Sequence, residues 1–102
     1  RIVVTSDNPR TEDPADIIEE ILEGFSAAAR DKVLVQSDRA RAIREAILAA
    51  EPGDVVLLAG KGHETYQEID GLRSHFDDAE VAAQVLADVA GVADCAGEVR
   101  RA

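Results

Sequence analysis

Two short polar loops carry the side chains best suited to chemistry. In the first loop, Asn8 and Arg10 flank Pro9, and Asp7 stands at its start. An arginine guanidinium grips a carboxylate through two parallel hydrogen bonds, and an asparagine amide serves either a carboxylate or an ammonium. Pro9 fixes the backbone between them, which lowers the entropy lost when both groups are held in one geometry. This loop therefore predicts a site for a carboxylate-bearing ligand.

The second loop, from Gly60 to Glu64, offers the complementary groups. Glu64 is an anion that pairs with an ammonium. Gly60 lets the backbone approach closely, so that its carbonyl accepts a hydrogen bond from the same ammonium. A carboxylate-binding loop opposite an ammonium-binding loop is what the zwitterionic head of an amino acid requires. We therefore predict a free amino acid as the ligand.

A simpler interpretation stays open for each loop. Asn-Pro after a strand is a common turn initiator, and Asp7 alone can form an Asx-turn. Gly60 and Gly62 suit a tight strand-to-loop turn, in which Lys61 and His63 would face solvent.

Alternating strands and helices are expected to position these loops. Short apolar runs predict three strands, at residues 2–5, 32–35 and 55–59. Apolar residues at helical spacing predict three helices, which begin at Asp13, at Ser37 or Asp38, and at Asp77, the last of them ending at Gly91. The run at 55–59 has no polar alternation, which is typical of a strand covered on both faces. A hairpin is expected over residues 66–75, with its turn at Asp70-Gly71.

This order of elements predicts an α/β fold, a Rossmann-like open and mostly parallel sheet with flanking helices and a C-terminal β-hairpin. In parallel strands the carboxyl ends lie at one edge, where ligands of open α/β sheets bind. The loops that follow strands 2–5 and 55–59 should therefore converge on one ligand. We expect one domain over residues 1–91 and a flexible tail over residues 92–102.

Composition excludes several classes of function. The 102 residues carry a formal charge of −10 and are 3% aromatic, which argues against nucleic acids and anionic membrane surfaces as partners. No apolar run is long enough to span a membrane and no signal peptide is visible, so we expect a cytoplasmic protein. The single cysteine, Cys95, excludes a disulfide framework and has no evident base beside it. A chain that lacks methionine and begins with Arg1 is expected to be a piece of a longer protein or a processed chain.

Two better-known site motifs do not match. A phosphate-binding P-loop needs a hydroxyl residue where Gly62 stands and a first glycine where Val55 stands. A zinc-binding helix beginning at His63 needs a second histidine where Gln67 stands. The sequence therefore predicts neither a nucleotide-phosphate loop nor a metal site.

Three segments resemble the C-terminal, amino-acid-binding domain of the Mur ligases, in particular the members that add meso-diaminopimelate to UDP-N-acetylmuramoyl-L-alanyl-D-glutamate. They are Thr5 to Pro14 with Asp-Asn-Pro-Arg, Asp38 to Ile43 with the start of a helix, and Leu57 to Gln67 with Gly-Lys-Gly-His-Glu. The resemblance implies a binding site for meso-diaminopimelate made of Asp7, Asn8, Pro9, Arg10, Gly60 and Glu64. Asn8 and Arg10 would hold the distal amino-acid head, and Gly60 and Glu64 its ammonium. Lysine-adding relatives differ within Asp-Asn-Pro-Arg, so an intact Arg10 favours diaminopimelate.

The resemblance also implies an ATP-dependent acid–amino acid ligase of peptidoglycan precursor synthesis. ATP and Mg²⁺ would be bound mainly outside this chain, by the central domain. The central and N-terminal Mur ligase domains and a UDP-muramoyl dipeptide would be its partners. The chain departs from the family in lacking an upstream strand with a Gly-Asp-Arg-Asp segment, and Ala79 stands where the family usually has arginine. We therefore expect this chain alone to be inactive.

Two alternatives stay open. The first is a non-catalytic amino-acid-binding or interaction module, which the absent Gly-Asp-Arg-Asp segment favours. The second is a domain of a related ligase that adds L-lysine, or glutamate to folates (the folylpolyglutamate type).

Overall fold

The computed structural model describes residues 1–90 and 98–100 of the chain. Its elements in chain order are β1 (Ile2–Val4), α1 (Pro14–Glu23), α2 (Ala27–Arg30), β2 (Val33–Val35), α3 (Arg39–Ala49), β3 (Tyr66–Ile69), β4 (Leu72–His75) and α4 (Asp78–Ala90). Strands β1 and β2 pair in parallel, with Val3 opposite Leu34. Strands β3 and β4 form a separate antiparallel hairpin, with Glu68 opposite Arg73.

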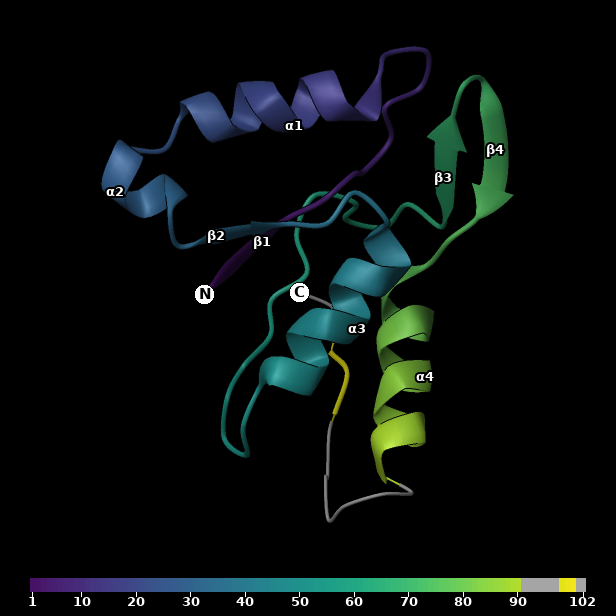
Figure 1. The fold of residues 1–102 in the computed structure, drawn as a ribbon. Coiled ribbons are helices and arrows are strands. Elements are labelled where there is room, and N and C mark those ends of the chain that lie inside the picture. The colour runs from purple at the N-terminus through teal and green to yellow at the C-terminus, as the bar shows by residue number, and fades with distance from the viewer. Residues whose placement is uncertain (91–97, 101–102) are drawn as a thin grey trace.

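The helices lie on both sides of the parallel pair (Figure 1). Helix α1 covers one side, and α3, packed against α4, lies on the other. On the α1 side, Val4 packs with Ile18 and Leu22 in a small buried core, to which Phe25 and Val33 add. Each such side chain stabilises the fold by roughly 1.5–3 kcal/mol when it is fully buried. This core holds the start of the loop that follows β1 in place.

Local capping signals predicted the helix starts correctly. Asp13 accepts a hydrogen bond from the amide of Ala15 at 2.9 Å and caps α1, with Pro14 in the first turn. Asp38, not Ser37, caps α3 by accepting from the amide of Arg41 at 3.1 Å. Caps depend on neighbours two or three residues away, so the sequence alone contains the information that they need.

The hairpin is confirmed with the predicted strand bounds. Its turn places Asp70 at φ 52° and Gly71 at φ 74°. Two successive residues with positive φ define the tight turn whose twist matches that of paired strands. Helix α2 was not predicted; it is a single turn capped by Ser26.

The strand predicted at residues 55–59 is not formed. The segment runs without regular structure, and the side chains of Val55 and Leu57 are 91% and 78% exposed. A cavity of about 890 Å³ separates it from Ile2 and Val3 of β1, so its backbone meets no neighbouring strand. A strand is stabilised by the ladder that it joins, and hydrophobic character alone does not supply one. The described residues therefore form a small α/β domain with one short parallel pair and one antiparallel hairpin, not a three-stranded parallel sheet.

The predicted helix end at Gly91 and most of the predicted tail, with Cys95, lie outside the described residues. In the part of the chain that the structure describes, no helix combines the length and apolar character needed to cross a bilayer.

Candidate functional site

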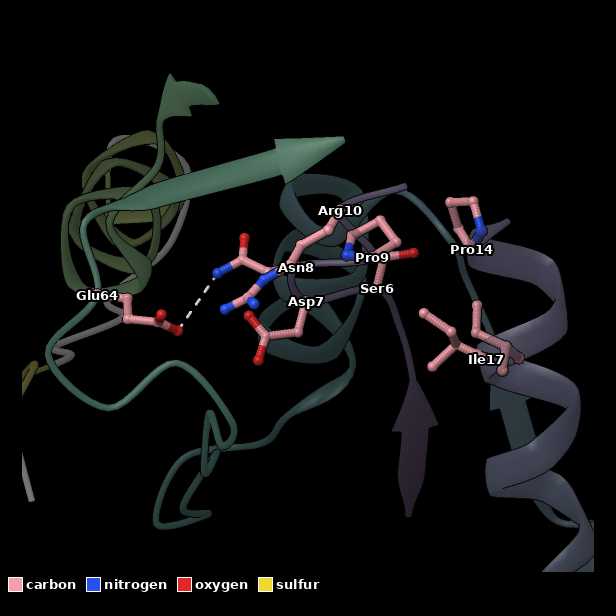
Figure 2. A pocket seen from close by; sticks show the side chains of 9 residues that line it. Ser6, Asp7, Asn8, Pro9, Arg10, Pro14, Ile17 and Glu64 are labelled. Atoms are coloured by element: carbon pink, nitrogen blue, oxygen red, sulfur yellow. Dashed lines mark hydrogen bonds between the residues drawn. The ribbon is translucent and has the colours of Figure 1, made fainter. Parts of the chain in front are cut away.

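A pocket of about 280 Å³ lies where the loop after β1 meets the loop before β3. Residues 6–10 form one wall, the start of α1 with Pro14 and Ile17 lies opposite, and Glu64 closes the side. Figure 2 shows the side chains of Asn8 and Arg10 extending from the first loop toward Glu64. The structure therefore brings together Asp7, Asn8, Pro9, Arg10 and Glu64.

Three hydrogen bonds, one between backbone groups and two between a side chain and the backbone, fasten the first loop to strand β3. The Gln67 side-chain amide donates to the carbonyl of Asp7 at 2.9 Å. The amide of Glu68 donates to Oδ1 of Asn8 at 2.8 Å, and the carbonyl of Glu68 accepts from the amide of Arg10 at 3.0 Å. The loop thus continues alongside the hairpin as a short extension of it, and its side chains are held by regular structure.

Arg10 adopts a left-handed backbone conformation with φ 58°. For a residue with a side chain this costs about 1–2 kcal/mol, so the surroundings must hold it. They do so from both ends, because the Arg10 amide donates to Glu68 and its carbonyl accepts from Gly71 at 3.2 Å. The guanidinium is exposed and, among the residues that the structure describes, forms no ion pair. The Arg10 backbone is therefore held in place, and its guanidinium is available to a ligand anion.

Lys61 is buried, which contradicts the simpler interpretation of this loop, in which it would face solvent. Its side chain is 1% exposed. The ammonium donates to Oδ1 of Asp7 at 2.9 Å, to Oδ1 of Asn8 at 3.3 Å and to the carbonyl of Tyr66 at 2.8 Å. It also lies 5.8 Å from the centre of the Phe76 ring. Three acceptors use the three ammonium protons, so burial leaves no donor of this group without a partner.

The glycines beside Lys61 permit this burial. Gly60 and Gly62 have φ values of 113° and 57°, which residues with side chains rarely adopt. A Cβ on Gly60 would lie 3.2 Å from Oδ2 of Asp7, so the two loops approach closely there. The pattern of a lysine between two glycines was visible in the sequence, but two of the three acceptors that bury it, Asp7 and Asn8, are distant in the chain. Gly60 itself does not line the pocket.

Glu64 is held by two donors. Its Oε1 accepts from Nδ2 of Asn8 at 3.3 Å, and its Oε2 accepts from the Tyr66 hydroxyl at 2.9 Å. This hydrogen bond raises the pKa of Tyr66 above its ordinary value, because it is made by the protonated phenol, and the charge of Glu64 acts in the same direction. The Arg73 guanidinium covers the Tyr66 ring at 4.3 Å. Tyr66 was predicted only as a strand residue, so its place beside the pocket is a finding of the structure.

Arg39 joins the bases of the two loops and was also missed from the sequence. Its guanidinium donates to the carbonyls of Ser6 and Ala59, both at 3.2 Å, and makes two hydrogen bonds to Asp78, at 2.8 and 2.6 Å. Burial lowers the pKa of Arg39, but the hydrogen bonds and charge of Asp78 outweigh burial and the pKa lies above its ordinary value. Arg39 therefore fixes the separation of the loops from beneath.

The pocket also contains an unsatisfied donor. Ser6 lines it, is 7% exposed, and its Oγ has no hydrogen-bond partner within the described part of the chain. Over the same residues there is no cluster of three or more histidine, cysteine or acidic side chains able to hold a metal ion. A cation, an amide donor and a carboxylate around one small pocket are complementary to a zwitterion.

Known proteins resemble this chain along most of its length. A family model described as "Mur ligase, glutamate ligase domain" matches residues 1–62. The UDP-N-acetylmuramoyl-L-alanyl-D-glutamate--2,6-diaminopimelate ligase of Synechococcus elongatus is 57% identical over 88 residues, which are 86% of this chain and 17% of that protein. The ligase of the same name from Aquifex aeolicus is 52% identical over 85 residues, 83% of this chain and 17% of that protein.

A solved structure agrees with the sequence relatives. A structure of UDP-N-acetylmuramoyl-L-alanyl-D-glutamate--2,6-diaminopimelate ligase superimposes with a TM-score of 0.79 at 40% identity, over 86% of this chain and 18% of that one. The chain thus spans less than a fifth of the length of these relatives. Family model, relatives and structure agree, and the chain belongs to the Mur ligase family.

Proposed function

We propose that this chain is the amino-acid-binding part of a ligase that adds meso-diaminopimelate to UDP-N-acetylmuramoyl-L-alanyl-D-glutamate in peptidoglycan precursor synthesis. Residues 1–91 would form its C-terminal domain, and the central and N-terminal domains of a longer, cytoplasmic protein would supply the rest. The relatives with this activity are 52–57% identical to the chain in the two cases compared above.

The observation that carries the proposal is the arrangement of charge around the pocket. The Arg10 guanidinium and Nδ2 of Asn8 extend toward Glu64 (Figure 2), which Nδ2 contacts at 3.3 Å, and the three residues line one pocket of about 280 Å³. In the proposal, Arg10 and Asn8 bind the carboxylate of one amino-acid head, and Glu64 binds its ammonium. The buried Ser6 hydroxyl is a further donor for the carboxylate.

Diaminopimelate suits this arrangement because it has two amino-acid heads. When one head is held by the pocket, the other extends from it with a free amine. That amine is the nucleophile of an amide ligase, so the chain would act by holding it in line with the acceptor. Fixing a reactant in this way removes part of the entropic barrier, and no side chain of the pocket needs to take part in bond making.

ATP and Mg²⁺, which such a ligase requires, do not fit the residues described here. Val55 and Gly62 stand where a P-loop needs glycine and a hydroxyl residue. Within residues 1–90 and 98–100 no cluster of ligands could hold a metal ion. In this proposal both are bound by the central domain, and this chain contributes no step of the nucleotide chemistry.

A chimeric enzyme tests the proposal directly. The matching C-terminal segment of the Synechococcus elongatus ligase would be replaced by this chain, and amide formation measured against meso-diaminopimelate, L-lysine and L-glutamate. We expect activity with meso-diaminopimelate. Arg10→Ala should raise its KM roughly 100-fold, because a charged bidentate contact is lost, and leave the KM for ATP unchanged.

Arg41→Ala is the matched control. Arg41 is an exposed arginine of α3 whose guanidinium forms an ion pair with Glu45 at 3.3 Å and with no other residue that the structure describes. Its kinetics should equal those of the parent chimera. An Arg10→Ala variant with an unchanged KM for meso-diaminopimelate would refute the carboxylate contact. Equal use of L-lysine or L-glutamate would refute the assignment of the substrate and favour a related ligase.

A further inference from the structure

We propose that Lys61 is a positioning residue that sets the direction of the Asn8 side-chain amide. Lys61 thereby makes the Asn8 position of the pocket a hydrogen-bond donor, which can bind a carboxylate but not an ammonium. The inference about amide direction stands on the hydrogen bonds alone, and its consequence for substrate rests on the proposed function.

The partners of Asn8 identify which of its atoms faces the pocket. One end of the amide receives hydrogen bonds from the Lys61 ammonium at 3.3 Å and from the backbone amide of Glu68 at 2.8 Å. Both partners only donate, so the atom between them must be the oxygen. The other end contacts Oε1 of Glu64, a carboxylate oxygen that only accepts. The NH₂ group is therefore directed toward Glu64, at the side of the pocket that Glu64 lines.

The Oδ1 atom of Asn8 has no acceptor site left, and this makes the position selective for a carboxylate over an ammonium. A carbonyl oxygen has two lone pairs, and Lys61 and Glu68 occupy both on Oδ1 of Asn8. No acceptor remains on Asn8 for a ligand ammonium. An asparagine in a free loop offers either end to a ligand, as the sequence allowed, but here only the donor end is available.

Lys61 also balances the negative charge that Asp7 brings to the pocket. Asp7 lines the pocket, and its Oδ1 lies 2.9 Å from the Lys61 ammonium. With Lys61 the four charged groups, Asp7, Lys61, Arg10 and Glu64, sum to zero, which matches a zwitterionic head. Without it Asp7 would present an uncompensated negative charge to the incoming carboxylate. Removing the ammonium should therefore weaken binding through both the direction of Asn8 and the charge of Asp7.

The side-chain amide of Asn8 can be observed directly, because Asn8 is the only asparagine in the sequence. In a ¹⁵N–¹H spectrum of the chain it gives one pair of NH₂ signals, distinguishable from glutamine by correlation to Cβ. We expect this pair to be dispersed and slowly exchanging. Lys61→Met should move it toward the shifts of a free asparagine side chain and speed its exchange.

Lys32→Met is the matched control, since Lys32 is the only other lysine and is exposed. It should leave the Asn8 pair unchanged. If the single Lys61→Met variant does not fold, the double variant Asp7→Ala with Lys61→Met leaves no unpaired charge, keeps Asn8 as the only asparagine and carries the same measurement. Unchanged Asn8 signals in a folded Lys61 variant would overturn the proposal.

Kinetics of the chimera distinguish a role of Lys61 in orienting Asn8 from a role in supporting the fold. Loss of the charged hydrogen bond should raise the KM for meso-diaminopimelate roughly 10- to 100-fold while kcat stays within about two-fold. Equal loss for every substrate, ATP included, would mean that Lys61 only supports the fold and would overturn the proposal. A parent chimera that does not use meso-diaminopimelate would instead refute the proposed function, and the Asn8 signals, which need no substrate, would still decide the role of Lys61.

Discussion

Residues 55–59 and residues 60–69 are consecutive in the chain, but they differ in burial and in regular structure. The first segment is apolar, yet Val55 is 91% exposed and no strand forms. The second is largely polar, yet Lys61 and Gln67, counted as whole residues, are 3% and 9% exposed. Hydrophobic character therefore does not decide which of the two is ordered by the rest of the molecule.

The hydrogen-bond partners available to each segment decide which of the two is ordered. The polar segment makes hydrogen bonds to the loop after β1 through Lys61, Gln67 and Glu68. The apolar segment faces a cavity of about 890 Å³, across which β1 is too distant to pair with it. An extended segment without a ladder gains little from burying one side, because its backbone groups stay with water.

Arg39 connects the two segments, and its removal should have the largest effect. It binds the carbonyl of Ala59, where the segments meet, together with Ser6 and Asp78. Arg39→Met leaves Asp78, whose side chain is 16% exposed, without its cation. We expect the free energy of unfolding to fall by about 3–5 kcal/mol, measured by urea denaturation.

Arg41→Met is the control for that measurement. Arg41 belongs to the same helix and, within the described part of the chain, forms an ion pair with Glu45 alone, on the surface. Its loss should cost less than about 1 kcal/mol. Equal losses for the two variants would show that the buried contacts of Arg39 do not hold the loops.

Gly60→Ala tests the close approach of the two loops and should have an intermediate effect. At φ 113° a side chain is strained, and its Cβ would lie 3.2 Å from Oδ2 of Asp7. The expected loss of stability is about 1–3 kcal/mol. Gly53→Ala separates the two causes, since Gly53 also has a positive φ, 91°, but a Cβ there would meet nothing within 4 Å. If Gly53→Ala costs as much, the loops are less closely packed than the structure describes.

Much of the fold and part of the site follow from local sequence. The caps at Asp13 and Asp38 and the turn at Asp70-Gly71 each depend on a few adjacent residues, and the structure confirms them. The convergence of the two loops was also predicted, from the rule that parallel strands end at one edge. The structure brings Arg10 and Glu64 to one pocket even though the second of those strands is absent.

The remaining features depend on partners distant in sequence. Lys61 looks exposed in isolation and is buried only because Asp7, Asn8 and Tyr66 supply its acceptors. Arg39 lies on a predicted helix, but nothing local indicates that it reaches Ser6. The third predicted strand, residues 55–59, does not form because its residues suit a strand but no neighbouring strand pairs with them. Local propensity therefore predicts elements, and pairing decides which of them form.

The smallest expected effect is the sharpest test of that conclusion, because two identical substitutions are compared. Val4→Ala removes two methyl groups from the core beside Ile18, where Val4 is 7% exposed, and should destabilise the chain by roughly 2 kcal/mol. Val55→Ala removes the same atoms from a side chain already 91% exposed, so the free energy of unfolding should change by less than about 0.5 kcal/mol. A loss at Val55 as large as that at Val4 would mean that residues 55–59 pack in solution as the apolar run predicts. The contrast between the two segments would then disappear, and the sheet would contain the third strand after all.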